Sequence, residues 1–183
     1  SLARDDPRLQ GPEQQRLAWQ RHTDFVLAGA RLGPAEKQRV AAINQRLATL
    51  FTKTLSQATH LSDRPYGALA LGVWGRNPGL DRKSVDEARS AIARQLEHEN
   101  NPSFKGALAI GLGLLGANES ENDLAALFAD SRESTFRGYL AVSLGLMLSR
   151  KHSDELTAAI DVKGLEPKFK LQLARSLGLL GDP

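Results

Sequence analysis

Histidines and carboxylates are the side chains in this sequence that could build a hydrolytic zinc site. Such a site needs two histidines four residues apart on one helix face, and a glutamate between them that activates the zinc-bound water. Only His98 is followed by a glutamate, Glu99, and Pro102 stands where the second histidine is required. We therefore expect no metal ligand, no catalytic residue and no cofactor, and we predict that the chain is not an enzyme. The other histidines, at scattered positions, are His22, His60 and His152.

A basic residue that recurs along the chain is the best candidate for a binding site. One interpretation is a ridge that binds an acidic peptide or a phosphate backbone. The other is a structural ladder, in which each basic side chain bonds to residues that end the preceding unit, namely Glu99 or Asn100, Asp130 and Asp161. The four candidate binding residues are Arg64, Lys105, Arg137 and Lys170.

Each of these basic residues opens a repeated apolar pattern. The pattern spans residues 104–116, returns at 136–148 and 169–181, and has an earlier form at 64–75. Such recurrence predicts a helical solenoid, in which each unit buries its apolar face against its neighbours. Glycine inside a helix is costly, so we expect the glycine column at close helix–helix contacts. The aligned columns are Gly72, Gly113, Gly145 and Gly178; Ala68, Ala109, Ala141 and Ala174; and Leu71, Leu112, Leu144 and Leu177.

Two further groups of residues could suggest ligand binding, but packing explains both better. The glycines at 111, 113 and 116 lie in an apolar helix, and the Lys-Ser or Lys-Thr pair of a phosphate-binding loop does not follow them. The aromatic residues fall at positions expected to pack between units, so we expect them in the core: Tyr66, Trp74 and Tyr139.

A second helix is predicted after each of the first three patterns, over residues 84–99, 122–129 and 154–160, with Ser84, Ser120 and Ser153 as candidate caps. This helix–turn–helix array, with endings such as Ala-Leu-Gly-Leu-Leu-Gly, resembles HEAT-like repeats over residues 62–183. The likeness is to the short class also seen in bilin-lyase-type proteins. The resemblance implies a binding scaffold, and ladders of Asp and Arg are a feature of such repeats, which favours the structural interpretation of the basic column.

The N-terminal third predicts two helices that form a hairpin. The first covers about residues 12–28, and the second begins at Pro34 and carries an apolar stripe. The stretch Phe25-Val-Leu-Ala-Gly-Ala-Arg-Leu, and the segment that opens Pro34-Ala-Glu-Lys-Gln-Arg-Val, resemble the N-terminal helices of the thimet oligopeptidase and peptidyl-dipeptidase family of zinc peptidases. The resemblance covers residues 13–57 and implies helices that wall a substrate channel, without the family's metal motif. The stripe consists of Val40, Ile43, Leu47, Leu50, Phe51 and Leu55.

Composition limits the class of protein. The 183 residues are 41% hydrophobic and 25% charged, with no cysteine and no apolar run long enough to cross a membrane. The net charge of +3 comes from residues 1–60, where nine basic residues face five acidic ones, an excess too small to indicate nucleic-acid binding. The absence of cysteine and of a signal peptide favours a cytoplasmic location. The first residues resemble a truncated N-terminus.

These observations predict an all-α protein with a helical hairpin over residues 1–60 and a solenoid of about four HEAT-like repeats over residues 61–183. We expect a non-catalytic scaffold that binds another protein or a peptide on the concave face lined by the second helices. The alternatives are a non-catalytic fragment of a zinc oligopeptidase-like enzyme and a nucleic-acid-binding HEAT-like module. The last pattern is predicted to lack its second helix, which suggests a homo-oligomer formed through the uncovered C-terminal repeat.

Overall fold

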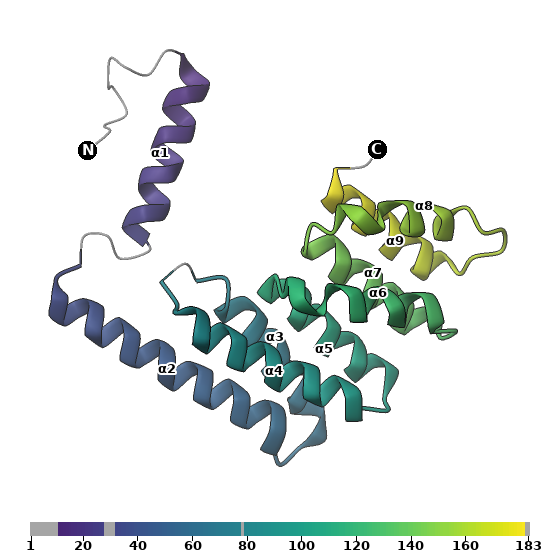
Figure 1. Ribbon diagram of the computed structural model, residues 1–183, viewed down its shortest axis with the longest axis horizontal. Coiled ribbons are helices and arrows are strands. Elements are labelled where there is room, and N and C mark those ends of the chain that lie inside the picture. Colours follow the sequence, from purple (N-terminus) through teal and green to yellow (C-terminus); the bar gives the residue numbers. More distant parts are fainter. Residues whose placement is uncertain (1–10, 28–31, 78, 182–183) are drawn as a thin grey trace.

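The computed structural model describes residues 11–27, 32–77 and 79–181, and all regular structure in these residues is helical (Figure 1). The predicted all-α class is therefore confirmed. Within this part of the chain, no helix is long and apolar enough to cross a membrane. The helices are α1 (Pro12–Leu27), α2 (Pro34–Gln57), α3 (Arg64–Trp74), α4 (Arg82–His98), α5 (Pro102–Leu115), α6 (Glu121–Asp130), α7 (Ser134–Leu146), α8 (Ser153–Ile160) and α9 (Pro167–Leu180), with short 3-10 helices at Leu61–Asp63, Asn118–Ser120 and Arg150–His152.

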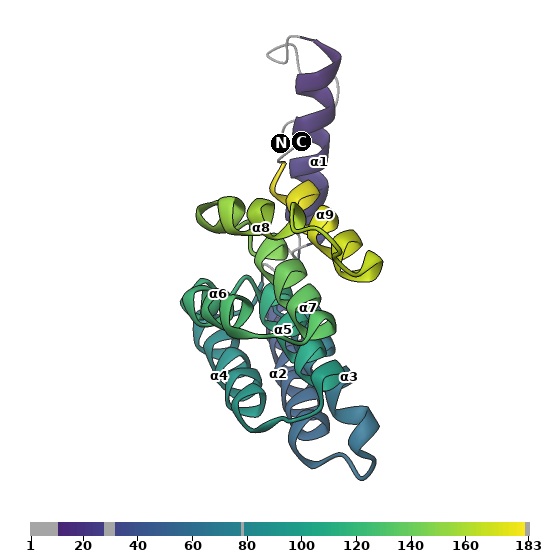
Figure 2. The same ribbon diagram turned by 90° about the vertical axis from the view of Figure 1, so that its right-hand side faces the viewer.

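The helices from α3 onward form two layers (Figure 2). In one layer α3, α5, α7 and α9 pack side by side in chain order, and we call this layer the row. The other layer contains α4, α6 and α8, each packed on the row helix that follows it in the sequence. The natural unit is thus a short helix and the row helix after it. This pairing corrects the expected division into units, because α9 completes a unit with α8 and does not begin an unfinished one.

Polar side chains at the helix starts fix where several elements begin. Asp81 caps α4, since its carboxylate accepts the backbone N–H of Ser84 at 2.8 Å and the Ser84 hydroxyl at 2.7 Å. Ser84, expected as the cap, is instead the group that donates to it. Asn101 caps α5 through the backbone N–H groups of Ser103 and Phe104. The break expected at Gly29 lies outside the described residues.

The glycine column lies at close helix–helix contacts of the row, as predicted, at three of its four positions. A Cβ atom added at Gly72 would stand 2.7 Å from the carbonyl oxygen of Gly111. The equivalent atom at Gly113 would be 2.8 Å from the carbonyl oxygen of Ser143, and at Gly145 it would be 2.9 Å from the Cα atom of Ser176. Backbone therefore packs on backbone along the row, which offsets the helix-propensity cost of glycine.

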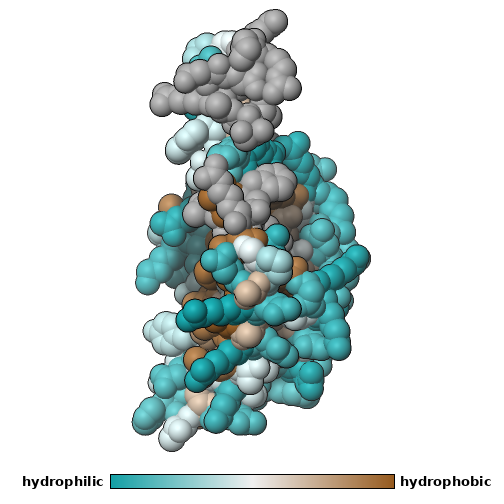
Figure 3. Space-filling model, turned by 90° about the vertical axis from the view of Figure 1, so that its left-hand side faces the viewer, coloured by the Kyte–Doolittle hydropathy of each residue, from teal (hydrophilic) through white to brown (hydrophobic). Residues whose placement is uncertain are grey.

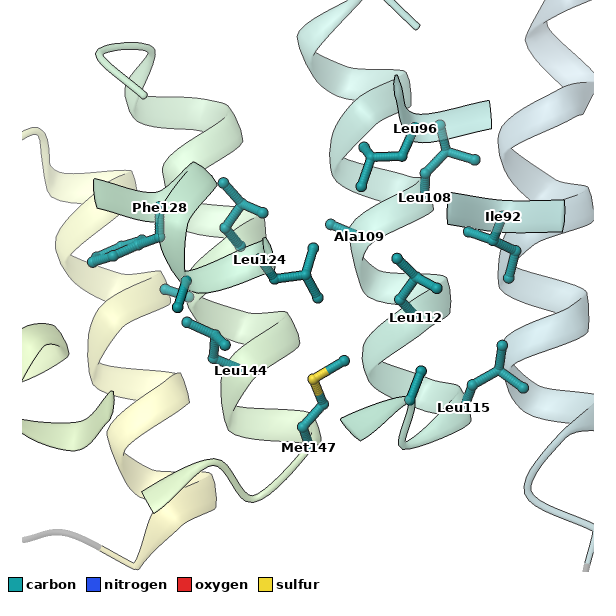
Figure 4. Close-up of a cluster of buried hydrophobic side chains, with 14 of the residues drawn as sticks. Ile92, Leu96, Leu108, Ala109, Leu112, Leu115, Leu124, Phe128, Leu144 and Met147 are labelled. Carbon is teal, nitrogen blue, oxygen red and sulfur yellow. The ribbon is translucent and has the colours of Figure 1, made fainter. Parts of the chain in front are cut away.

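The leucines beside this column fill the space between the layers (Figure 4). Leu112 from α5, Leu124 from α6 and Leu144 from α7 belong to one continuous cluster of buried side chains and are at most 1% exposed. Trp74 lies in the same cluster, as expected, whereas Tyr66 is 68% exposed, so the prediction that Tyr66 packs in the core was wrong. Tyr66 precedes Gly67, the glycine of α3 that faces α2, and lies on a side of the helix that no described residue covers.

Helix α2 packs onto the array and does not pair with α1. It contacts α3 and α4, and a Cβ atom added at Gly67 of α3 would lie 2.6 Å from the backbone nitrogen of Leu55. The domain boundary predicted at residue 60 therefore separates two helices that pack together. Helix α1 projects away from α2 with Trp19 exposed, so the expected α1–α2 hairpin does not form (Figure 1). Figure 3 views the molecule from the left-hand side of Figure 1. On this face, hydrophobic residues lie between hydrophilic ones.

Replacement of Gly113 by leucine should destabilise the protein, because the added side chain forces α5 away from the backbone of α7. We expect a loss of about 3 kcal/mol in the free energy of unfolding. Gly178→Leu is the matched control. No atom lies within 4 Å of a Cβ atom at Gly178, so this change should gain stability by up to about 1 kcal/mol from helix propensity. Urea unfolding monitored by circular dichroism measures both. Equal effects of the two substitutions would contradict the packing role of the column.

Candidate functional site

An open groove with a volume of about 1070 Å³ lies between α2 and α4. We call it the α2–α4 groove. It forms because α2 packs closely on α3 and lies farther from α4. Small side chains line much of it, and hydroxyl and amide groups stand among them. From α2 come Gln45, Ala48, Thr49, Thr52, Lys53, Ser56 and Gln57, and from the α4 side come Arg82, Lys83, Ser84, Asp86, Glu87, Ala88, Ser90, Ala91 and Arg94.

Basic side chains outnumber acidic ones in the α2–α4 groove by four to two. Lys83 lies 3.9 Å from Glu87 across one helical turn, but both side chains are exposed and such a pair contributes little. Within the described part of the chain, Lys53 and Arg94 form no ion pair, so their charges are available to a ligand. The groove is therefore suited to an anionic segment that also offers hydrogen-bonding groups.

A smaller recess of about 380 Å³ lies between α4 and α6 and has the opposite charge. Leucines from three helices contribute apolar surface, and three acidic residues and one lysine stand around them. The two hollows thus differ in chemistry along the same layer of helices. The side chains in question are Leu96, Leu112, Leu124 and Leu127, with Glu97, Asp123, Asp130 and Lys105.

Two members of the predicted basic column are held by contacts inside the protein. The Nε–H of Arg137 donates to the carbonyl oxygen of Phe128 at 3.0 Å. Its guanidinium carbon lies 4.8 Å from the centroid of the Phe128 ring and 5.1 Å from that of Phe169. The ammonium of Lys105 lies 5.3 Å from the ring centroid of Phe136. These contacts are cation–π interactions in which each cation meets the aromatic residue that opens the next row helix.

The acidic partners expected for the ladder are not the groups that these cations meet. Among the described residues Asp130 forms no ion pair with Arg137. The Arg137 side chain instead donates to the carbonyl oxygen of Phe128, two residues before Asp130. At the ends of the column the contacts are fewer. The Nε atom of Arg64 is buried without a hydrogen-bond partner, and Lys170 is exposed. The four residues stand on four successive row helices, so they do not gather into one site.

A charged cluster joins the start of α6 to the segment before α8. The carboxylate of Glu121 accepts a hydrogen bond from the Ser149 hydroxyl and lies 2.9 Å from the ammonium of Lys151. Two effects act on the pKa of Glu121. Partial burial pushes it up, but the hydrogen bonds from Ser149 and Lys151 outweigh burial, so the pKa lies below its ordinary value. The cluster fixes the loop between α7 and α8 against the neighbouring unit.

Sequence reasoning missed the groove residues Lys53 and Arg94. Nothing in a single sequence shows that the helices that carry them, α2 and α4, face each other. No group of three metal-ligating side chains occurs in the part of the chain that the structure describes.

Comparisons of the chain with protein-family models, with curated proteins and with solved structures found no match. The likenesses to HEAT-like repeats and to the oligopeptidase helices therefore stay interpretations of the sequence.

Replacement of Arg137 by alanine should lower the free energy of unfolding by about 2 kcal/mol, since it removes a charged hydrogen bond and two ring contacts. Lys170→Ala changes the equivalent residue of α9, which has no such contact among the described residues, and should stay within about 0.5 kcal/mol of the parent. Urea unfolding of both variants tests this contrast. Similar losses in both would show that the column stabilises the protein by another route.

Replacement of Glu121 by glutamine should cost about 1 kcal/mol of stability near neutral pH, because the carboxylate loses its charge-assisted bonds. The lowered pKa of Glu121 means that its contribution is complete above the ordinary value of 4.5 and disappears as the pH falls below it. The difference between the parent and the variant should therefore shrink in acid. Urea midpoints at a series of pH values measure it, with the exposed Glu97→Gln as control. A difference that persists in acid would contradict this explanation.

Proposed function

We propose that the chain is a non-catalytic scaffold of HEAT-like repeats that binds an acidic segment of another protein in the α2–α4 groove. The observation that carries the proposal is the groove itself, an open hollow with uncompensated positive charge at Lys53 and Arg94. Stacked helical repeats form extended surfaces of this kind because each unit adds a helix at a regular offset.

The lining of the groove favours an extended peptide over a compact small molecule. Ala48 of α2 and Ala91 of α4 leave room along the groove, where a peptide backbone can approach closely. Thr52 and Ser56 offer hydroxyl groups beside them. An extended peptide can use such distributed hydrogen-bonding groups along an open groove, whereas small-molecule sites are concave and bury most of the ligand.

The packing of α2 also bears on the alternatives. In the array α2 covers α3, and Leu55 is buried in the common core, which accounts for this helix without a role in a peptidase channel. A phosphate backbone fits the groove less well than an acidic peptide, because Asp86 and Glu87 stand among the basic residues. Nucleic-acid binding would also require a steep dependence on salt.

Selection of short peptides from a displayed library against the full chain tests the proposal. We expect enrichment of peptides rich in Asp and Glu, whose affinity falls at least tenfold in Arg94→Glu, since one cation becomes an anion. Arg132→Glu makes the same charge change at an exposed position outside the groove, and should leave affinity within about twofold after allowance for long-range charge.

Several outcomes would overturn the proposal. Peptides without acidic enrichment, or peptides that lose equal affinity in both variants, would place binding elsewhere. Peptide hydrolysis that a chelator abolishes would favour the oligopeptidase alternative. Tight binding of DNA or RNA that weakens steeply with salt would favour the nucleic-acid alternative.

A further inference from the structure

The recess between α4 and α6, which we call the α4–α6 recess, combines an apolar wall with acidic groups. Leu96 of α4 and Leu127 of α6 line it, and the methyl groups of Ala93 and Ala126 stand beside them. Its volume of about 380 Å³ lies within the range of ligand-binding pockets. A wall of this kind suits a ligand that has a hydrocarbon stem and a charged end.

The carboxylates of the recess have no partners inside the described part of the protein. Among the described residues Glu97, Asp123 and Asp130 form neither a hydrogen bond nor an ion pair. Carboxylates just outside the recess are paired, since Glu119 lies 3.9 Å from a basic side chain and Glu121 lies 2.9 Å from one. The negative charge of the recess is therefore available to a cationic ligand.

A buried hydroxyl group in the recess is also without a partner. Ser120 is 5% exposed and lines the recess just before α6 begins. Its side chain does not cap α6, and it forms no hydrogen bond with any described residue. Buried polar groups are normally hydrogen-bonded, because the loss of hydration costs free energy. Ser120 therefore offers an acceptor to a group that enters the recess, one helical turn away from Asp123.

The packing of the repeat does not require this acidic set. Equivalent residues of the second layer are 32 residues apart, as the buried Ile92, Leu124 and Leu156 show. Between α6 and α8 the same interval gives one acidic residue, Glu155, which lies 3.3 Å from His152. The residues there that correspond to Glu97, Asp123 and Asp130 are Ala129, Glu155 and Val162. The acidic set is specific to this recess, which favours a role in binding over a role in folding.

The recess has one end with mixed charge and one end that is purely acidic. Lys105 stands where α4 and α6 end, because its ammonium lies 5.3 Å from the ring of Phe136 at the start of α7. Asp130 is the last residue of α6 and shares that end. Asp123 stands seven residues earlier, about 10 Å along the helix axis, near Ser120. A cationic ligand is therefore best placed at the Asp123 end, away from Lys105.

We propose that the α4–α6 recess binds the side chain of an arginine in a peptide segment of a partner protein. The guanidinium donates to the Asp123 carboxylate and to the Ser120 hydroxyl, while the aliphatic stem lies against Leu96 and Leu127. Arginine fits better than lysine, because its planar group of five donors serves both acceptors at once and is more weakly hydrated. The recess lies across α4 from the α2–α4 groove and has the opposite charge, so the inference does not rest on the proposed function.

The probe is the peptide acetyl-Gly-Gly-Arg-Gly-Gly-amide, in which arginine supplies the only side chain. Titration into the isotope-labelled full chain, followed by NMR, should shift the amide signals of Ser120, Asp123 and their neighbours, and the shifts should saturate at millimolar peptide. The same peptide with citrulline in place of arginine keeps the shape but loses the charge, so it should bind at least tenfold more weakly. Absence of saturable shifts, or saturable shifts confined to another part of the chain, would overturn the proposal.

Two substitutions with matched controls test the recess itself. Asp123→Asn removes the charge and keeps the shape, so it should weaken binding at least fivefold. Asp154→Asn, at an exposed aspartate of α8 without a partner among the described residues, should leave binding within about twofold. Ala126→Phe fills the rim without a change of charge and should weaken binding at least fivefold, whereas Ala158→Phe, at the corresponding exposed position of α8, should not. The same spectra show whether each variant is folded.

Equal effects of Asp123→Asn and Asp154→Asn would show a general attraction of cations to acidic surface, and would overturn the proposal. Loss of binding in Asp123→Asn but not in Ala126→Phe would also overturn it, because the ligand would then lie outside the recess. Free arginine that binds more tightly than the peptide would make the ligand a small molecule. Self-association of the full chain that Asp123→Asn abolishes would make the occupant a second copy, and either result would contradict the proposal. None of these outcomes affects the α2–α4 groove, which is tested with acidic peptides.

Discussion

The close approach of helix backbones at small residues is the constraint on which the rest of this structure depends. It occurs where Gly67 meets α2, where Gly72 meets α5, where Gly113 meets α7 and where Gly145 meets α9. At each place a side chain on the glycine would collide with backbone atoms, which cannot move aside as a flexible side chain can. Helices α2, α3, α5, α7 and α9 therefore pack closely one on the next, and leucines beside the glycines are buried in the common core.

This row decides where surface is left for partners. The helices of the second layer pack on the row helices that follow them and meet one another little, so hollows open between them, as between α4 and α6. The α2–α4 groove arises in the same way, because α2 packs closely on α3 and leaves part of α4 uncovered. At the far end the row presents α9 in the form that its inner helices present to their neighbours. The proposed binding surfaces, the α2–α4 groove and the α4–α6 recess, are thus consequences of this packing.

Much of the fold follows from the sequence because its signals are local or repeated. The spacing of apolar residues gave the helices, and the aligned glycines gave the contacts that Gly113 and Gly145 make. The pairing of α4 with α5 was not visible, since a period cannot tell which neighbour a helix packs on. The groove charges were missed for a related reason, because Lys53 and Arg94 are distant in sequence and meet only through the packing of α2. The aromatic partners of Lys105 and Arg137 likewise depend on contacts between units.

Urea unfolding of residues 61–183, beside the full chain, tests most directly whether the stack begins at α2. Removal of α1 and α2 exposes the face of α3 at Gly67 and takes Leu55 out of the core. We predict a lower midpoint and a broader transition for the shortened chain, measured by circular dichroism. A midpoint and cooperativity equal to those of the full chain would show that α2 is an independent appendage, and would contradict a single stack from α2 to α9.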